Sequence, residues 1–372
     1  MGRGPDDRGL TGADIEAQAV PVEVPPAPEA PAATKPPTFR PNWQTVREWS
    51  SSGEDWLEDR PPAREYLLSA PSTRSGFAGM VPLGKVGMLA AGGGVGKTMA
   101  LCQLAVAVAA GVPGSLSGPA WLGTYRVDRP GRVALLTGEE DAPELRRRLF
   151  QAAAVMNLSP DERRRLAGRL YAVPLTGSDV TMVAGEGGGW ADTPAAAELL
   201  ELLADGDPWS LVVVDPLSRF AGADAEKDNA AATRMVELCE RLARAARGAT
   251  VLVAHHTSQK ARQAGDDDDA TMSRGVTALT DGMRFVFGLT SMPGANGADG
   301  KRRQDRGRVV LRMTKNNYGL FPDPLTLVRD PDHGGALRAE AREERDAREA
   351  AEPKKQRPEA APAGRARGRT GE

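Results

Sequence analysis

One short segment constrains the fold of this chain more than any other feature. Residues 91–98 read Ala-Gly-Gly-Gly-Val-Gly-Lys-Thr, between apolar residues 86–90 and a helix-forming run at 99–110. Glycines let backbone N–H groups curl around an anion, and the start of a helix adds the positive end of its dipole. The segment fits the Walker A pattern except at Ala91, which replaces the first glycine. It predicts a phosphate-binding loop in an α/β fold.

The loop gives each of its polar residues an expected role. Lys97 should contact the β and γ phosphates of ATP, and Thr98 should bind Mg²⁺. An ordinary glycine-rich turn would not need Lys-Thr after its last glycine. ATP and Mg²⁺ are therefore the expected ligands. The expected nucleotide contacts are Gly92, Gly93, Gly94, Val95, Gly96, Lys97, Thr98 and Met99.

Acidic residues end two further apolar runs. Residues 211–215 have the Walker B form, and Asp215 is expected to hold Mg²⁺ at the carboxyl end of its strand. Residues 132–137, expected to form the strand beside the phosphate-loop strand, lead into Glu139 and Glu140. Either glutamate is a candidate to orient the attacking water. Because acids at a helix start also stabilise the helix dipole, a capping role for one of them stays open.

A fourth apolar run, residues 250–255, ends in His255 and His256. Neighbouring side chains of a strand face opposite ways, so at most one of the two points at the phosphates. This argues against a metal site made by the pair. We expect a γ-phosphate sensor that couples hydrolysis to the following loop, with His256 among the catalytic residues.

Strand and helix patterns alternate between the two ends of the 372-residue chain. They predict an α/β domain around a mainly parallel sheet at residues 81–337, after a lead-in segment at 42–80. Residues 1–41 and 338–372 are expected to be largely disordered tails, the second beginning with a charged, helix-forming stretch. The remaining predicted elements are a strand at 170–173, helices at 142–156, 194–204 and 229–247, and a hairpin of strands 284–290 and 308–314.

Composition excludes several other classes of protein. The chain carries 48 basic and 50 acidic residues, so its overall charge gives no electrostatic case for nucleic-acid binding. Cys102 and Cys239 stand in apolar runs without the spacing of a disulfide framework or zinc site. No membrane span or signal peptide is evident, so a cytoplasmic protein without a membrane partner is expected.

Six motifs occur in order between about residues 61 and 337. They are residues 91–98, 137–141 with Arg148, 214–220, 252–256, the pair 273–275 and 281–284, and 314–319; residues 333–337 follow as a further match. In this order they resemble the RecA-fold hexameric replicative helicases, the family of AAA-type P-loop ATPases typified by the plasmid helicase RepA. The resemblance implies a RecA-like core.

The resemblance also implies roles for single residues. Glu139 takes the place of the catalytic glutamate, with Glu140 replacing an aspartate, and His255 and His256 match the sensor pair. Arg284 matches the arginine that a neighbouring subunit inserts toward the γ-phosphate, which implies a ring, hexameric in this family. A surface arginine at a strand start is the simpler alternative.

Two further basic residues, Arg148 and Lys315, fall on basic positions of the family pattern without separable roles. An ion pair with Glu144 on the same helix is the alternative for Arg148. For Lys315 the alternative is an exposed strand end.

The family pattern also implies a single-stranded DNA partner, with a replication initiator or primase as a further one. Lys260 and Arg262 follow the sensor strand, but the aspartates at 266–269 repel phosphate. A second candidate is the hairpin tip, which carries Lys301, Arg302, Arg303, Arg306 and Arg308. Neither segment has the aromatic residues that stack on bases.

Three functions therefore remain. The main hypothesis is an ATP-driven, ring-forming DNA helicase or translocase. The alternative is a regulatory or assembly ATPase that forms rings without unwinding. Phosphoryl transfer to a small molecule is the third, and it would leave the sensor pair and Arg284 without a task.

Overall fold

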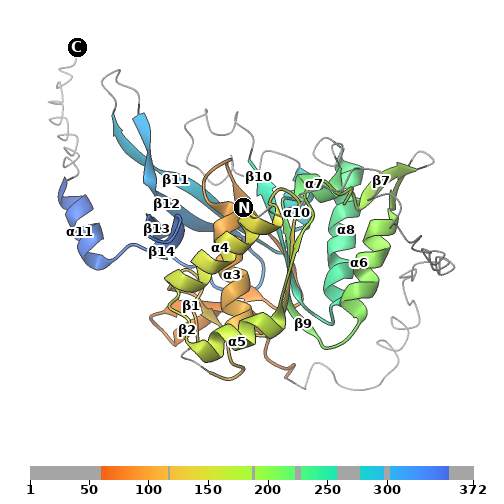
Figure 1. The fold of residues 1–372 in the computed structure, drawn as a ribbon, viewed down its shortest axis with the longest axis horizontal. Helices are drawn as coiled ribbons and strands as arrows, with labels where there is room; N and C mark the ends of the chain where they lie inside the picture. Colours follow the sequence, from red (N-terminus) through yellow and green to blue (C-terminus); the bar gives the residue numbers. More distant parts are fainter. Residues whose placement is uncertain are drawn as a thin grey trace, which may run out of the picture. The chain divides into compact units, whose positions relative to one another are not determined.

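The computed structural model describes residues 60–115, 118–186, 189–222, 228–257, 277–296 and 302–351. Within them lies a 9-stranded sheet in the order β14-β13-β12-β11-β3-β10-β9-β5-β6 (Figure 1). Every neighbouring pair from β11 to β6 is parallel, whereas β11 to β14 pair antiparallel. The predicted α/β fold with a mainly parallel central sheet is confirmed.

The strands of this sheet are β3 (Val86–Ala91), β5 (Arg132–Thr137), β6 (Leu170–Pro174), β9 (Trp209–Asp215), β10 (Thr250–His256), β11 (Phe285–Asn296), β12 (Arg302–Asn316), β13 (Leu325–Asp330) and β14 (Ala336–Ala339). The helices are α3 (Lys97–Ala110), α4 (Ala142–Val155), α5 (Pro160–Arg169), α6 (Pro194–Ala204), α7 (Leu217–Ala221), α8 (Asn229–Ala245), α10 (Thr277–Gly282) and α11 (Arg342–Ala351). A 3-stranded sheet joins β1 (Tyr66–Ser72), β2 (Gly76–Pro82) and β4 (Arg126–Val127), and β7 (Val183–Glu186) pairs with β8 (Gly189–Asp192).

Each central strand is buried on both faces. In β5, Val133 and Leu135 pack into the core with α3 and α4, whereas Ala134 and Leu136 pack into the core with α6 and α8. Figure 1 shows these two helical layers on the two faces of the sheet. Alternation between two apolar cores explains why these strands read as continuous apolar runs.

The predicted position of β5 beside the phosphate-loop strand is wrong. β10 and β9 lie between β3 and β5, and the direct neighbours of β3 are β10 and β11. A helical crossover can pass over positions that later strands fill, so order along the chain does not determine order across the sheet. Residues 138–141 therefore follow a strand beside β9, the strand that ends in Asp215.

Several elements escaped the sequence analysis. Helix α5 begins with a capping box in which Ser159 and Glu162 bond to each other's backbone, a Ser-x-x-Glu signal that predicts a helix start. The small sheet of β1, β2 and β4 and the edge strands β13 and β14 were also not predicted. These short strands lack a long apolar run, which is why their pattern is weak.

The C-terminal part combines confirmed and untested expectations. The hairpin of β11 and β12 is confirmed and longer than predicted, and the expected charged helix is present as α11. The tail expected at residues 1–41, the tip at 297–301 and residues 352–372 lie outside the described residues. Cys102 and Cys239 are buried free thiols, and burial raises the pKa of each to about 12. No helix of the described part is long and apolar enough to cross a membrane.

Candidate functional site

The phosphate loop has the predicted strand–loop–helix setting, between β3 and α3. Gly94 and Gly96 have φ values of 73° and 106°, which L side chains rarely adopt. Gly96 also begins α3 without any side-chain cap. The first N–H groups of α3 thus keep the arrangement that binds anions at a helix start. Val95 and Met99 are buried in the core, so only their backbone faces the loop.

Lys97 connects the loop to the Walker B strand. Its side chain is 5% exposed, and its Nζ lies 3.3 Å from Oδ1 of Asp215. Asp215 ends β9, and β10 separates β9 from β3 in the sheet. The loop and the aspartate therefore meet at the carboxyl edge of the sheet, as the sequence predicted.

Asp215 and Thr98 also fit the expected magnesium ion. Oδ1 of Asp215 is buried and has no hydrogen-bond partner among the described residues, although it faces the Lys97 ammonium. A buried carboxylate oxygen of this kind suits a hard cation, which in nucleotide sites takes few protein ligands besides phosphate oxygens and water. Thr98 adjoins Lys97 at the start of α3. These two residues remain the candidate magnesium ligands.

His256 lies between the loop and a glutamate. Its Nε2 is 3.3 Å from Nζ of Lys97 and 3.8 Å from Oε2 of Glu139. The register of β10 with β3 sets His256 opposite Ala91, the first residue of the loop. Of the two predicted sensor histidines, His256 is the one whose contact with Lys97 is defined.

Glu139 and Glu140 have different surroundings. Glu140 pairs with Arg148 at 2.8 Å, and burial raises the pKa of its carboxyl group. Asp141 accepts a hydrogen bond from the backbone N–H of Glu144, so it is Asp141 that caps α4. Glu139 is 46% exposed, and its carboxylate faces His256. This arrangement leaves Glu139 as the glutamate that is open to a water molecule.

The simpler interpretation of Arg148 holds in part. Its Nε lies 3.3 Å from Glu144 on the same helix, as the alternative predicted, and its guanidinium also binds Glu140. Arg148 therefore positions the acidic segment after β5.

Arg284 lies at the opposite end of the sheet from the loop of its own chain. Its backbone N–H donates to Val86, the first residue of β3, and its side chain lies 3.5 Å from Glu240 on α8. The 6 residues of β3 separate it from the loop by about 20 Å. Arg284 cannot reach the nucleotide site of its own chain.

Lys315 and its neighbours are structural in this chain. Lys315 donates to the carbonyl oxygens of Thr280 and Asp281, and burial lowers the pKa of its ammonium. The exposed strand end considered for Lys315 is therefore wrong, because α10 packs against it. Asn316 donates to the carbonyls of Met80 and Leu320, and this joins β12 to the small sheet.

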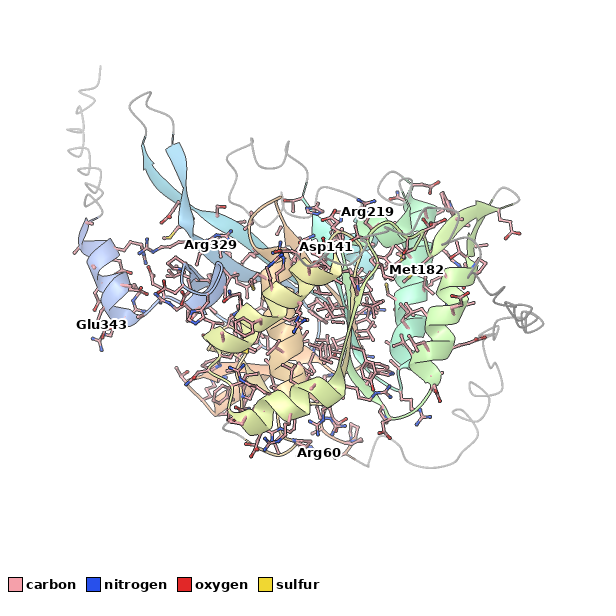
Figure 2. All side chains as sticks on the ribbon, in the orientation of Figure 1. Arg60, Asp141, Met182, Arg219, Arg329 and Glu343 are labelled. Carbon is pink, nitrogen blue, oxygen red and sulfur yellow. The ribbon has the colours of Figure 1, made fainter. Side chains whose placement is uncertain are left out.

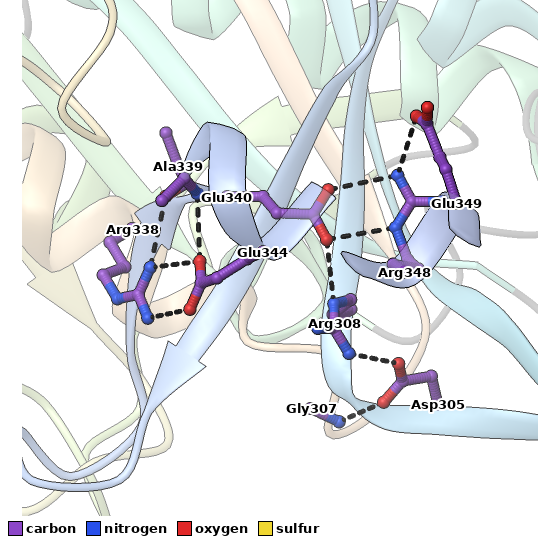
Figure 3. Close-up of polar contacts among 10 residues, drawn as sticks. Asp305, Gly307, Arg308, Arg338, Ala339, Glu340, Glu344, Arg348 and Glu349 are labelled. Atoms are coloured by element: carbon purple, nitrogen blue, oxygen red, sulfur yellow. Dashed lines mark hydrogen bonds and ion pairs between the residues drawn. The ribbon is translucent and has the colours of Figure 1, made fainter. Parts of the chain in front are cut away.

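The hairpin arginines are only partly described. Arg308 binds Asp305 at 3.2 Å and Glu340 at 3.0 Å, and Glu340 also binds Arg348 of α11 (Figure 3). Arg308 is thus part of the connection between the hairpin and α11. The side chains of the other predicted tip residues, and the loop residues Lys260 and Arg262, lie outside the described residues.

One residue at the loop was missed by the sequence analysis. Arg329 of β13 donates from Nη2 to the carbonyl oxygen of Gly94 at 3.0 Å. Figure 2 shows it beside α3, on strands that follow the hairpin. It lies 235 positions along the chain from Gly94, and no motif signals it.

With this geometry established, the relatives of the chain become informative. A family described as AAA domain, AAA_25, matches residues 49–262, more than half of the chain. The chain belongs to this family. The match covers the phosphate loop, Glu139, Asp215 and His256 of this AAA domain, and it ends before Arg284 and Arg329.

Three solved structures are similar to this AAA domain. One is an isolated ATPase domain with 13% identity, covering 68% of this chain and 84% of that chain, with a TM-score of 0.44. The RadB recombinase has 17% identity, covering 67% and 88%, with a TM-score of 0.40. A DnaB-like replicative helicase, described with its interactions with primase, has 14% identity, covering 68% and 57%, with a TM-score of 0.44.

Proposed function

We propose that this AAA domain protein is an ATP-hydrolysing, ring-forming DNA helicase or translocase of the plasmid-replication RepA type. The observation that carries the proposal is the contact of His256 with both Lys97 and Glu139. It joins a phosphate-binding residue, a sensor and a candidate base at one edge of the sheet. This combination suits a motor, in which hydrolysis must be coupled to movement.

The chemistry assigns one task to each residue. Lys97 and the N–H groups of the loop neutralise the triphosphate, and Thr98 and Asp215 hold Mg²⁺, which supplies charge neutralisation at the phosphates. Glu139 accepts a hydrogen bond from the attacking water and orients it toward the γ-phosphate. Lys97 leaves Asp215 and His256 for the phosphates when nucleotide binds. His256 thereby senses whether a γ-phosphate is present.

A ring is proposed from the position of Arg284. An arginine that cannot reach its own loop supports transition-state stabilisation only for a neighbouring subunit. Such a head-to-tail contact closes into a ring if the rotation between subunits is suitable, and the RepA resemblance suggests six subunits. Single-stranded DNA is the proposed partner, with a replication initiator or primase as a further one.

One observation favours the regulatory alternative, an ATPase ring that unwinds nothing. Arg308 is the member of the basic hairpin whose side chain is described, and it is committed to Asp305 and Glu340. A DNA-binding tip would keep its arginines available for phosphate. The two functions therefore differ in what the hairpin does.

The deciding experiment measures ATP turnover with and without single-stranded DNA, together with strand displacement on a forked duplex. The proposal predicts stimulated turnover and displacement. Hydrolysis with neither stimulation nor displacement would contradict the motor and support the regulatory alternative. A protein that hydrolyses no ATP would contradict both.

A further inference from the structure

Arg329 lies flat against the phosphate loop of its own chain. Its Nη2 donates to the carbonyl oxygen of Gly94, and a Cβ atom placed on Gly96 would lie 3.1 Å from its Nη1 and 3.6 Å from its Cζ. The guanidinium thus borders the two loop glycines that have positive φ angles. One bond to a carbonyl leaves most of the five guanidinium donors available.

The fold fixes this position from a second side. Arg329 pairs directly with Leu337 across β13 and β14. The backbone of Leu337 makes two hydrogen bonds with the buried side chain of Gln103, at 2.7 Å and 2.9 Å, and Gln103 belongs to α3. The helix that begins at the loop therefore also anchors the strand pair that carries Arg329.

The charge of Arg329 has no acidic partner among the described residues. Asp330 beside it accepts from His333 and from the backbone N–H of Asp332. Burial lowers the pKa of the Arg329 guanidinium, and no neighbouring carboxylate opposes this effect. A partly desolvated cation without a counterion is costly unless an anion joins it.

We propose that Arg329 is a nucleotide-binding residue that donates to the phosphates of the nucleotide held in the loop of its own subunit. The inference rests on the proposed ATP binding and adds a second cation to Lys97. Guanidinium groups are suited to this because their fixed donors match phosphate oxygens in pairs. Arg329 would then act in cis, whereas Arg284 acts on a neighbour.

Titration calorimetry with ATP and with inorganic tripolyphosphate tests the assignment on the full chain. Arg329→Ala should raise the Kd of both ligands at least about tenfold, and Arg329→Lys should raise them less because the charge is kept. Arg312→Ala is the matched control, since Arg312 is exposed on the neighbouring strand β12. It should leave both constants unchanged.

The outcomes separate this proposal from the proposed function. An unchanged Kd for ATP in Arg329→Ala, with a lower Tm of the nucleotide-free protein, would show a purely structural brace and overturn the assignment. A weaker Kd for ATP with an unchanged Kd for tripolyphosphate would place the contact on the base or ribose and also overturn it. Failure of the wild-type protein to bind ATP would instead contradict the proposed function.

Discussion

The imidazole Nε2 of His256 lies 3.3 Å from the ammonium Nζ of Lys97. The two residues are 159 positions apart and come from adjacent strands of the sheet, β10 and the segment after β3. A γ-phosphate in the loop would compete with His256 for the same ammonium group. The contact therefore gives β10 a direct means of registering whether the site holds a triphosphate.

The Lys97→Ala substitution should abolish ATP turnover, by at least about 100-fold, because it removes the cation that stabilises the phosphates. The fold should persist, with unfolding destabilised by about 1–3 kcal/mol because Asp215 loses its buried counterion. Steady-state ATPase assays and thermal unfolding measure the two effects. Lys85→Ala, at the other end of β3, is the control; wild-type turnover by Lys97→Ala would refute the assignment of the loop.

Glu139→Gln and Glu140→Gln should differ sharply. Glu139→Gln should lower kcat by at least about 100-fold, since it removes the proposed base and keeps the shape of the side chain. Glu140→Gln should lower kcat by less than about tenfold, because it weakens only the pair with Arg148. Each variant is the control for the other. Equal losses, or the reverse order, would move the base to Glu140.

The His256→Ala variant should still bind ATP, with a Kd within about threefold of wild type, but should lower kcat at least about tenfold. The physical reason is that Lys97 keeps its phosphate contact while the link to Glu139 is lost. His333→Ala is a suitable control, since this third histidine pairs with Asp330 away from Lys97. Normal turnover by His256→Ala would exclude the sensor role.

Acid should loosen the attachment of α11 through Glu344. Two hydrogen bonds from Arg338, at 2.6 Å and 2.8 Å, hold the pKa of Glu344 at about 2, below its ordinary 4.5 (Figure 3). A lowered pKa stabilises the fold above the unfolded value, and this stabilisation is lost as the pH falls toward the folded one. The difference in Tm between wild type and Glu344→Gln should therefore shrink between about pH 5 and pH 2.

Glu343→Gln, on the same helix, serves as the control for this titration. Glu343 is exposed and makes no defined ion pair among the described residues, so its substitution should leave the pH profile unchanged. A Glu344→Gln difference that does not vary with pH would contradict the proposed role of the Arg338 pair.

The sequence was sufficient for the central strands and helices because each carries a strong local signal. The run 211–215 had to be buried on both faces, and Gly96-Lys97-Thr98 had to begin a helix. Lateral order carries no such signal. The intervention of β9 and β10 between β3 and β5 depends on where each crossover packs, so the neighbour of the loop strand was assigned incorrectly.

The candidate site divides in the same way. Lys97, Thr98, Asp215 and the glutamates were evident because each stands at a fixed distance from an apolar run. Arg329 was invisible because its contact with Gly94 depends on the pairing of β13 with β14 and on Gln103, and neither leaves a pattern in the sequence. Whether Glu139 or Glu140 faces the site also depended on tertiary contacts, through Arg148.

The central claim is a nucleotide site shared between subunits, with the loop on one side and Arg284 on the other. Arg284→Ala alone should bind ATP but lose turnover, as should Glu139→Gln. A ring that contains both variants holds some sites with a wild-type loop side and a wild-type Arg284 from the neighbour. Glu139→Gln mixed with Lys97→Ala is the matched control, since both changes affect the loop side and should give no rescue.

The most direct test is the ATPase rate of rings assembled from equal amounts of Arg284→Ala and Glu139→Gln, with subunit mixing verified by differently tagged chains. The account predicts a rate well above that of either variant alone, about one quarter of the wild-type rate if subunits mix at random and each complete site acts independently. No recovery in rings that demonstrably mix would contradict the shared site.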